Sequence, residues 1–198
     1  MGKISEIDVN FAVSGVINNT EVNYFNVRGK PFSIYGLMAN EGDRFRRIPA
    51  ALAQQVSPGV QNLHGNTAGG RIRFRTNSSF VAIRAVLPGY CLMSHMPFLG
   101  SSGFDLYEDN SAGSHYRGSF MPPLERKDSY ESILRLGQRK SRSFTIYFPL
   151  YDDVSELYVG LEPGATLEAG EPYRDLVVIT LIFMIKIEKN NSLRLLFI

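Results

Sequence analysis

The sequence of 198 residues contains one cysteine, Cys91, and three histidines, so it has few of the side chains that build disulfides and zinc sites. A single thiol excludes an internal disulfide framework and a cysteine-rich zinc site. We expect Cys91 to be a free, buried thiol, because free cysteine is among the most buried residue types. The chain therefore depends on its own core, and folding at this length buries about 70% of the surface that the unfolded chain exposes.

A strong excess of one charge is also lacking. The 21 lysines and arginines against 19 aspartates and glutamates give a formal net charge of +2. Proteins that bind a phosphate backbone use a much larger basic excess. We therefore expect no nucleic-acid partner.

No apolar run is long enough to cross a membrane. The longest, residues 176–185, has about half of the roughly 20 residues that a spanning helix needs. Residues 1–15 carry Glu6 and Asp8 where a secretory signal would be continuously apolar. These absences predict a cytoplasmic protein with no membrane partner.

Short segments of alternating apolar and polar residues dominate the chain and predict β-strands. Over residues 71–76 the arginines share one face, while Ile72 and Phe74 share the other. Residues 77–79 are typical of a turn, and the alternation resumes over residues 80–87. The sequence therefore predicts a β-hairpin here.

Two further strands are predicted before and after a turn at Asp152 and Asp153, over residues 143–149 and 157–161. Strands this short and this closely spaced are typical of a sandwich or barrel. We predict an all-β fold, an antiparallel β-sandwich, with a core that contains Ile72, Phe74, Val81, Ile83, Phe144, Ile146, Phe148, Leu157 and Val159.

Helix is scarce. One short helix is predicted over residues 49–56, because Pro49 suits the first helical position and the next residues have good helix propensity. Residues 128–137 fit either a capped helix or a strand, and their surroundings favour the strand. Residues 100–103, Gly-Ser-Ser-Gly, lack the strand-to-helix context of a nucleophile turn and are interpreted as a flexible loop.

The last 23 residues differ from the rest, because fifteen of them are apolar and nearly continuous. Such a run predicts a strand buried on both faces or a segment that needs a covering partner. We therefore divide the chain into a β-sandwich domain over residues 1–175 and an apolar tail over residues 176–198. Self-association through this tail is expected.

Recognisable catalytic motifs are missing. His64, His95 and His115 form no metal-ligand pair, and the sequence has no Gly-x-Ser-x-Gly turn and no phosphate-binding glycine loop. The arginine row of residues 71, 73 and 75 has forked donors that suit an anionic or sugar ligand, but such a row is also typical of the solvated face of a strand.

Several separated motifs are more specific, and they occur in a fixed order. They are Arg47-Ile48-Pro49-Ala50-Ala51-Leu52, Val60-Gln61-Asn62-Leu63, residues 68–78, Met93-Ser94-His95-Met96-Pro97, Gly103-Phe104-Asp105-Leu106-Tyr107 and Phe148-Pro149-Leu150-Tyr151. Over about residues 24–172 the chain resembles the N-terminal accessory domain of bacterial SGNH-type (GDSL-like) hydrolases, which is named for its Gly-x-Asp-Leu-Tyr motif.

The resemblance implies a jelly-roll-like β-sandwich, similar to carbohydrate-binding modules, placed ahead of a catalytic α/β domain that hydrolyses acyl esters. In that family the first catalytic strand leads into a short turn that bears the serine nucleophile. This chain reads Thr180-Leu181-Ile182 there. We therefore expect the catalytic domain to be missing, as in a truncated gene.

From the matching motif positions we predict ligand contacts at His95, Met96, Asp105 and Tyr107, with help from Arg73 and Arg75. Gly103 is expected to supply a backbone conformation closed to other residues, Leu106 to face the core, and Asp105 to bind turn amides. No catalytic residue, metal ligand or cofactor is expected.

Three functions follow from these observations. The first is a noncatalytic accessory module that orients or weakly binds an acylated carbohydrate or another acyl ester. The alternative is the N-terminal fragment of an active acyl-ester hydrolase whose catalytic half is supplied separately. A third is a structural protein that self-associates through its tail.

Overall fold

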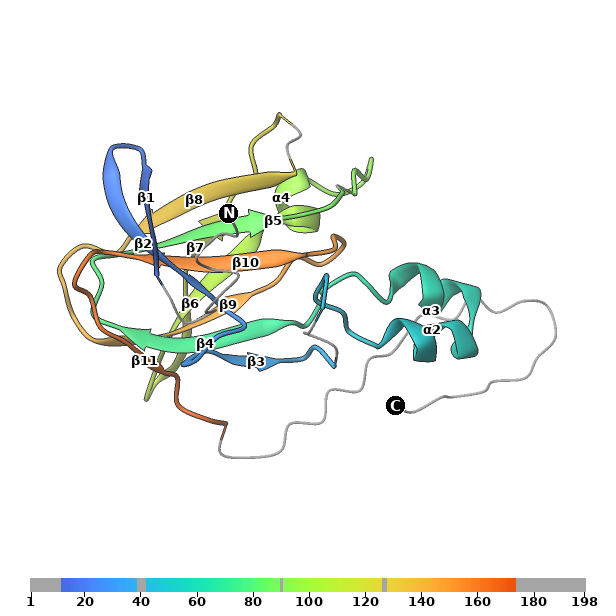
Figure 1. The fold of residues 1–198 in the computed structure, drawn as a ribbon, viewed down its shortest axis with the longest axis horizontal. Helices are drawn as coiled ribbons and strands as arrows, with labels where there is room; N and C mark the ends of the chain where they lie inside the picture. The colour runs from blue at the N-terminus through green and yellow to red at the C-terminus, as the bar shows by residue number, and fades with distance from the viewer. Residues whose placement is uncertain (1–11, 39–41, 90, 126–127, 174–198) are drawn as a thin grey trace, which may run out of the picture.

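The computed structural model describes residues 12–38, 42–89, 91–125 and 128–173, which form two antiparallel sheets packed face to face (Figure 1). The predicted antiparallel β-sandwich is confirmed. Within these residues, no helix has the length and apolar character needed to span a bilayer.

The first sheet has five strands. In spatial order they are β1 (Val13–Ile17), β2 (Thr20–Asn26), β10 (Glu156–Leu161), β5 (Phe80–Val86) and β8 (Ser129–Arg135). The strand β8 confirms the favoured interpretation of residues 128–137.

The second sheet runs in the order β11 (Leu167–Ala169), β4 (Arg71–Thr76), β9 (Arg142–Tyr147), β6 (Phe104–Asn110) and β7 (Gly113–Phe120). A short strand, β3 (Ser33–Tyr35), pairs with the first half of β4, whereas β11 pairs with its second half. Because β9 pairs along the whole of β4, the strands β3 and β11 share its other edge.

The core lies between the sheets, where alternate residues of each strand meet. All nine residues predicted for it are at most 3% exposed, and Leu106 is fully buried as expected. Phe74 and Phe144 pair across β4 and β9, with ring centroids 5.8 Å apart. The polar faces of the same strands are therefore turned away from the core.

The predicted hairpin over residues 71–87 is wrong. β4 pairs with β9, and β5 pairs with β10 and β8, so residues 77–79 carry the chain from one sheet to the other. Ser78 is buried, and its hydroxyl accepts hydrogen bonds from the amides of Phe80 and Glu162. This serine ties the crossing to the chain that follows β10, which a turn propensity alone does not reveal.

The described residues contain three short helices and not only the one predicted: α2 (Ala50–Val56), α3 (Pro58–Leu63) and α4 (Phe98–Ser102). The helix predicted over residues 49–56 is confirmed as α2. Together α2 and α3 form a helical arm that extends from one end of the sandwich (Figure 1) and buries only Ala53. Arg47 holds the base of the arm, because its Nη2 donates to the Leu63 carbonyl at 2.6 Å.

Residues 100–103 are not a flexible loop, because α4 occupies most of them and both Ser101 and Ser102 are buried. Gly103 has an ordinary φ of −81°. A Cβ on Gly103 would lie 2.5 Å from the Leu99 carbonyl oxygen, so close packing explains this glycine, and the expected special backbone conformation is wrong.

Cys91 is a free thiol but only half-buried, and its amide donates to Asp152 Oδ1 at 2.6 Å. The expectation of full burial is therefore wrong. The apolar tail predicted over residues 176–198 lies outside the described residues, so its self-association stays a prediction.

Candidate functional site

The outward face of the second sheet gathers polar and aromatic side chains from three neighbouring strands. The register places Arg71, Tyr147 and Asp105 in one row across β4, β9 and β6. The next row contains Arg73, Thr145 and Tyr107. Because strands lie about 4.8 Å apart, each row spans roughly 10 Å. These rows bring three of the six predicted site residues, Asp105, Arg73 and Tyr107, to one face.

Three tyrosines, Tyr116 on β7, Tyr107 on β6 and Tyr147 on β9, form what we call the tyrosine face. The ring centroid of Tyr107 lies 5.6 Å from that of Tyr116 and 5.4 Å from that of Tyr147, with both pairs edge to face. Tyr116 is 58% exposed. The three rings therefore present an accessible aromatic ridge and not one flat platform.

A chain of hydrogen bonds holds the ring of Tyr116 in place. Asp105 accepts a hydrogen bond from the Ser119 hydroxyl, and the same hydroxyl lies 2.7 Å from Tyr116 Oη. The expectation that Asp105 binds turn amides is not met, because its carboxylate instead accepts from a serine on the neighbouring strand. Asp105 therefore adds a carboxylate beside the ridge.

Two of the three arginines on β4 are buried, so the interpretation of the arginine row as a solvated face is wrong for them. Arg71 and Arg73 are 8% and 9% exposed. Arg73 Nη2 donates to Asp109 Oδ2 at 3.3 Å, and the same oxygen accepts from Thr145 Oγ1 at 2.6 Å. Arg75 is exposed, and its Nε donates to Ser141 Oγ at 3.0 Å. Ligand contacts at Arg73 and Arg75 stay predictions.

Tyr147 in the tyrosine face interacts electrostatically with charged and polar groups at the arginine end of the sheet. The pKa of Tyr147 is raised, mainly because the ring is partly buried and also because Tyr173 and Asp109 lie near it, while Arg71 acts in the opposite direction. Tyr147 is therefore a neutral hydrogen-bonding phenol at physiological pH.

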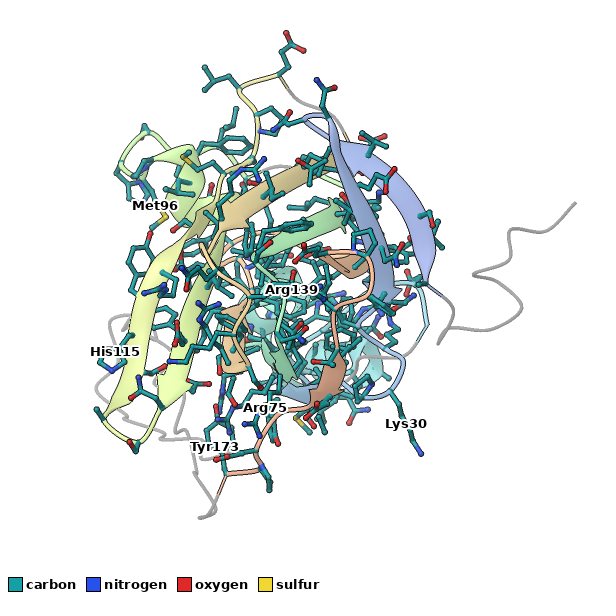
Figure 2. All side chains as sticks on the ribbon, turned by 90° about the vertical axis from the view of Figure 1, so that its left-hand side faces the viewer. Lys30, Arg75, Met96, His115, Arg139 and Tyr173 are labelled. Carbon is teal, nitrogen blue, oxygen red and sulfur yellow. The ribbon has the colours of Figure 1, made fainter. Side chains whose placement is uncertain are left out.

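His95 and Met96 lie beyond the end of the tyrosine face, in the loop before α4. His95 is exposed and Met96 is half-buried, with the Met96 amide donating to the Met93 carbonyl at 3.4 Å. Figure 2 shows Met96 far from Arg75 and from Tyr173. The structure therefore separates these two predicted site residues from the arginine end of the face.

Within the described part of the chain, no group of three or more histidine, cysteine, aspartate or glutamate side chains is arranged to hold a metal ion. His64 is in the helical arm, with Nδ1 2.6 Å from the Gln61 carbonyl oxygen, and His115 is on β7. Figure 2 shows His115 and Met96 at opposite ends of the β6–β7 pair.

Sequence reasoning missed Tyr116, Ser119 and Tyr147 as members of the site. Tyr147 was detectable, because it alternates with core residues in β9 and so belongs to the outward face. Tyr116 and Ser119 carried no such signal, since β7 reads Gly-Ser-His-Tyr-Arg-Gly-Ser-Phe and has little apolar alternation.

A family model, GxDLY, described as the N-terminus of SGNH hydrolase-type esterases, matches residues 22–167. Two solved structures have a similar fold. One, described as a GDSL-like lipase from Bacteroides ovatus, is 24% identical with a TM-score of 0.65, and the match covers 76% of this chain and 43% of that chain.

The other, described as a salicylyl-acyltransferase from a tetracycline biosynthetic pathway, is 20% identical with a TM-score of 0.58, and the match covers 77% of this chain and 42% of that chain. This chain therefore spans less than half the length of either structure, and at these identities the likeness shows the fold alone. No curated protein matches the chain.

Proposed function

Because this chain belongs to the GxDLY family, the N-terminus of SGNH hydrolase-type esterases, we propose that it is a noncatalytic module that holds an acylated carbohydrate for such an esterase. The partner in this proposal is a catalytic α/β domain. The single observation that supports ligand binding is the tyrosine face, with its exposed ring at Tyr116 and its carboxylate at Asp105.

Aromatic rings and adjacent hydrogen-bonding groups together suit a sugar. The C–H faces of a sugar ring pack against aromatic carbon, while its hydroxyls bind phenols, serines and carboxylates. Tyr107, Tyr116 and Tyr147 supply the first kind of contact, and Asp105 and Ser119 supply the second. The acyl group then extends beyond the ridge toward the catalytic partner.

Binding should be weak. The ridge is open, its rings meet edge to face, and the chain has no tryptophan to provide a larger aromatic surface. Little surface is buried against such a site, so we expect a dissociation constant of about millimolar to high micromolar.

Chemical-shift mapping with acetylated oligosaccharides tests the proposal. We expect perturbed amides on β6, β7 and β9, and a Tyr116→Ala variant should lose most of the response, because it removes the most exposed ring. A Val16→Ala variant is the control, since Val16 is an exposed apolar residue on β1 of the other sheet. Shifts confined to the first sheet, or an unchanged response in Tyr116→Ala, would contradict the proposal.

A further inference from the structure

The described part of the chain ends in a segment that lies directly on β4. We call residues 170–173 the exit strap. A Cβ on Gly170 would lie 2.9 Å from the Arg73 carbonyl carbon and from the Phe74 amide nitrogen. The strap therefore begins in backbone contact with β4, at a distance that only glycine permits.

Two buried arginines then hold the strap. Arg73 Nη1 donates to the Glu171 carbonyl at 2.5 Å, and Arg71 Nε donates to Tyr173 Oη at 2.7 Å. The Tyr173 ring also covers both guanidinium groups, with its centroid 4.5 Å from Arg73 Cζ and 5.1 Å from Arg71 Cζ. Tyr35 on β3 packs edge to face against the same ring, 4.9 Å between centroids.

Both arginines are anchored beneath the strap as well. Arg73 pairs with Asp109 on β6, and Arg71 Nη1 donates to the Gly69 carbonyl at 3.1 Å. A buried guanidinium is costly unless its donors are used, and its planar fork suits simultaneous hydrogen bonding and stacking. Arg71 Nε and Nη1 and Arg73 Nη1 and Nη2 all donate to the protein itself, whereas the buried Arg73 Nε has no hydrogen-bond partner in the described structure. Arg75 is the exposed arginine of the row.

We propose that Arg71 and Arg73 act as a lock that fixes the exit strap on the outward face of the second sheet. The lock fixes Tyr173, the last residue that the structure describes, beside the tyrosine face. A linker of small polar residues would instead behave as a flexible coil. The lock itself does not depend on the proposed function. Its consequence does, because only the proposed function provides a catalytic domain that the lock would position over the bound ligand.

The lock is tested in the full 198-residue chain by double electron–electron resonance between two spin labels. One label is placed at Glu171→Cys in the strap and the other at Ala112→Cys in the exposed turn between β6 and β7, with Cys91→Ser removing the native thiol. We expect one narrow distance distribution. Adding Arg73→Ala should abolish the narrow peak, because the carbonyl contact and the stacked guanidinium are both lost.

The matched control is Arg75→Ala, since Arg75 lies on the same strand and face but is exposed, and in the described part of the chain its side chain binds Ser141 and not the strap. This control should keep the narrow peak. A broad distribution in the parent, a narrow one in Arg73→Ala, or equal broadening in Arg75→Ala would overturn the proposal.

A second variant addresses the risk that Arg73→Ala does not fold. Tyr173→Ala removes a ring that is 37% exposed and leaves the buried sheet intact, and it should also abolish the narrow peak. The spin-label result is independent of ligand. If the distance distribution is narrow but the sugar titration shows no binding, the proposed function alone is rejected. If the sugar binds but the distance distribution is broad, the lock alone is rejected.

Discussion

Phenylalanine rings fill much of the space between the sheets, and alternation predicts three of them, Phe74, Phe144 and Phe148, as core residues. Phe148 packs against Phe45 and Phe104, with ring centroids 5.1 and 5.5 Å apart, while Phe74 packs against Phe144. Each ring is at most 3% exposed. These contacts make single phenylalanines large contributors to the free energy of unfolding.

Replacing Phe74 or Phe148 by alanine should lower the free energy of unfolding by about 3–5 kcal/mol, because apolar surface is lost and a cavity remains. Urea unfolding of each variant measures this loss. Tyr116→Ala is the control, and as an exposed residue it should change stability by only about 0.5 kcal/mol. Losses below about 1 kcal/mol for both phenylalanine variants would mean that the rings carry little of the packing energy.

Ionisation of Tyr24 on β2 is expected to destabilise the domain at alkaline pH. Burial of its phenol, followed by the nearby charge of Glu131, raises its pKa from 10.0 to about 12, although the Arg84 guanidinium 4.2 Å from its ring acts in the opposite direction. The folded state therefore holds this proton more tightly than the unfolded state does. Stability is fully present below about pH 10 and falls as the pH rises toward 12.

We expect the urea midpoint to fall between about pH 10 and pH 12 in the parent protein, and to fall less in Tyr24→Phe, which has no phenol to ionise at this position. Some loss should remain in the variant, because the pKa of Tyr158 is also raised to about 12, mainly by burial. An identical alkaline loss in both proteins would show that Tyr24 ionisation does not limit stability.

At the scale of elements, alternation revealed which side chains each strand buries but not which strands pair. Ile72 and Phe74 point inward as predicted, yet β4 and β5 belong to different sheets. The reason is that alternation reports burial on one face, and a strand crossing to the opposite sheet has the same pattern as a hairpin. The crossing is held by a distant hydrogen bond that the Ser78 hydroxyl accepts from the Glu162 amide, which no local pattern contains.

The same limit applies to the candidate site. Asp105 and Tyr107 were identified through the Gly-x-Asp-Leu-Tyr resemblance, and the arginine row through alternation. The burial of Arg71 and Arg73 could not be predicted from either signal. It depends on the exit strap, in which Tyr173 contacts Arg71 from 102 residues further along the chain. Contacts over such distances are set by the whole fold.

At the scale of the whole molecule, ester hydrolysis requires side chains from separate parts of the chain to meet in one arrangement. An activated serine needs a histidine base within hydrogen-bonding reach, an acid that orients the base, and donors for the oxyanion. Ser101 and Ser102 are buried, with their hydroxyls 3.1 Å apart, and Ser101 Oγ donates to the Phe98 carbonyl. No serine–histidine hydrogen bond occurs among the residues that the structure describes.

We therefore expect the 198-residue chain to hydrolyse neither p-nitrophenyl acetate nor acetylated sugars above the background of a heat-treated control. Ser94 and His95 are adjacent in an exposed turn that the Met96 amide closes by donating to the Met93 carbonyl. Adjacency alone does not create a serine–base pair, because the serine hydroxyl must donate to the imidazole, and no such hydrogen bond joins these two residues in the described structure. Steady-state assays of the purified protein measure the rate. Turnover that disappears in Ser94→Ala or His95→Ala would contradict the noncatalytic role and place the active site in the loop before α4.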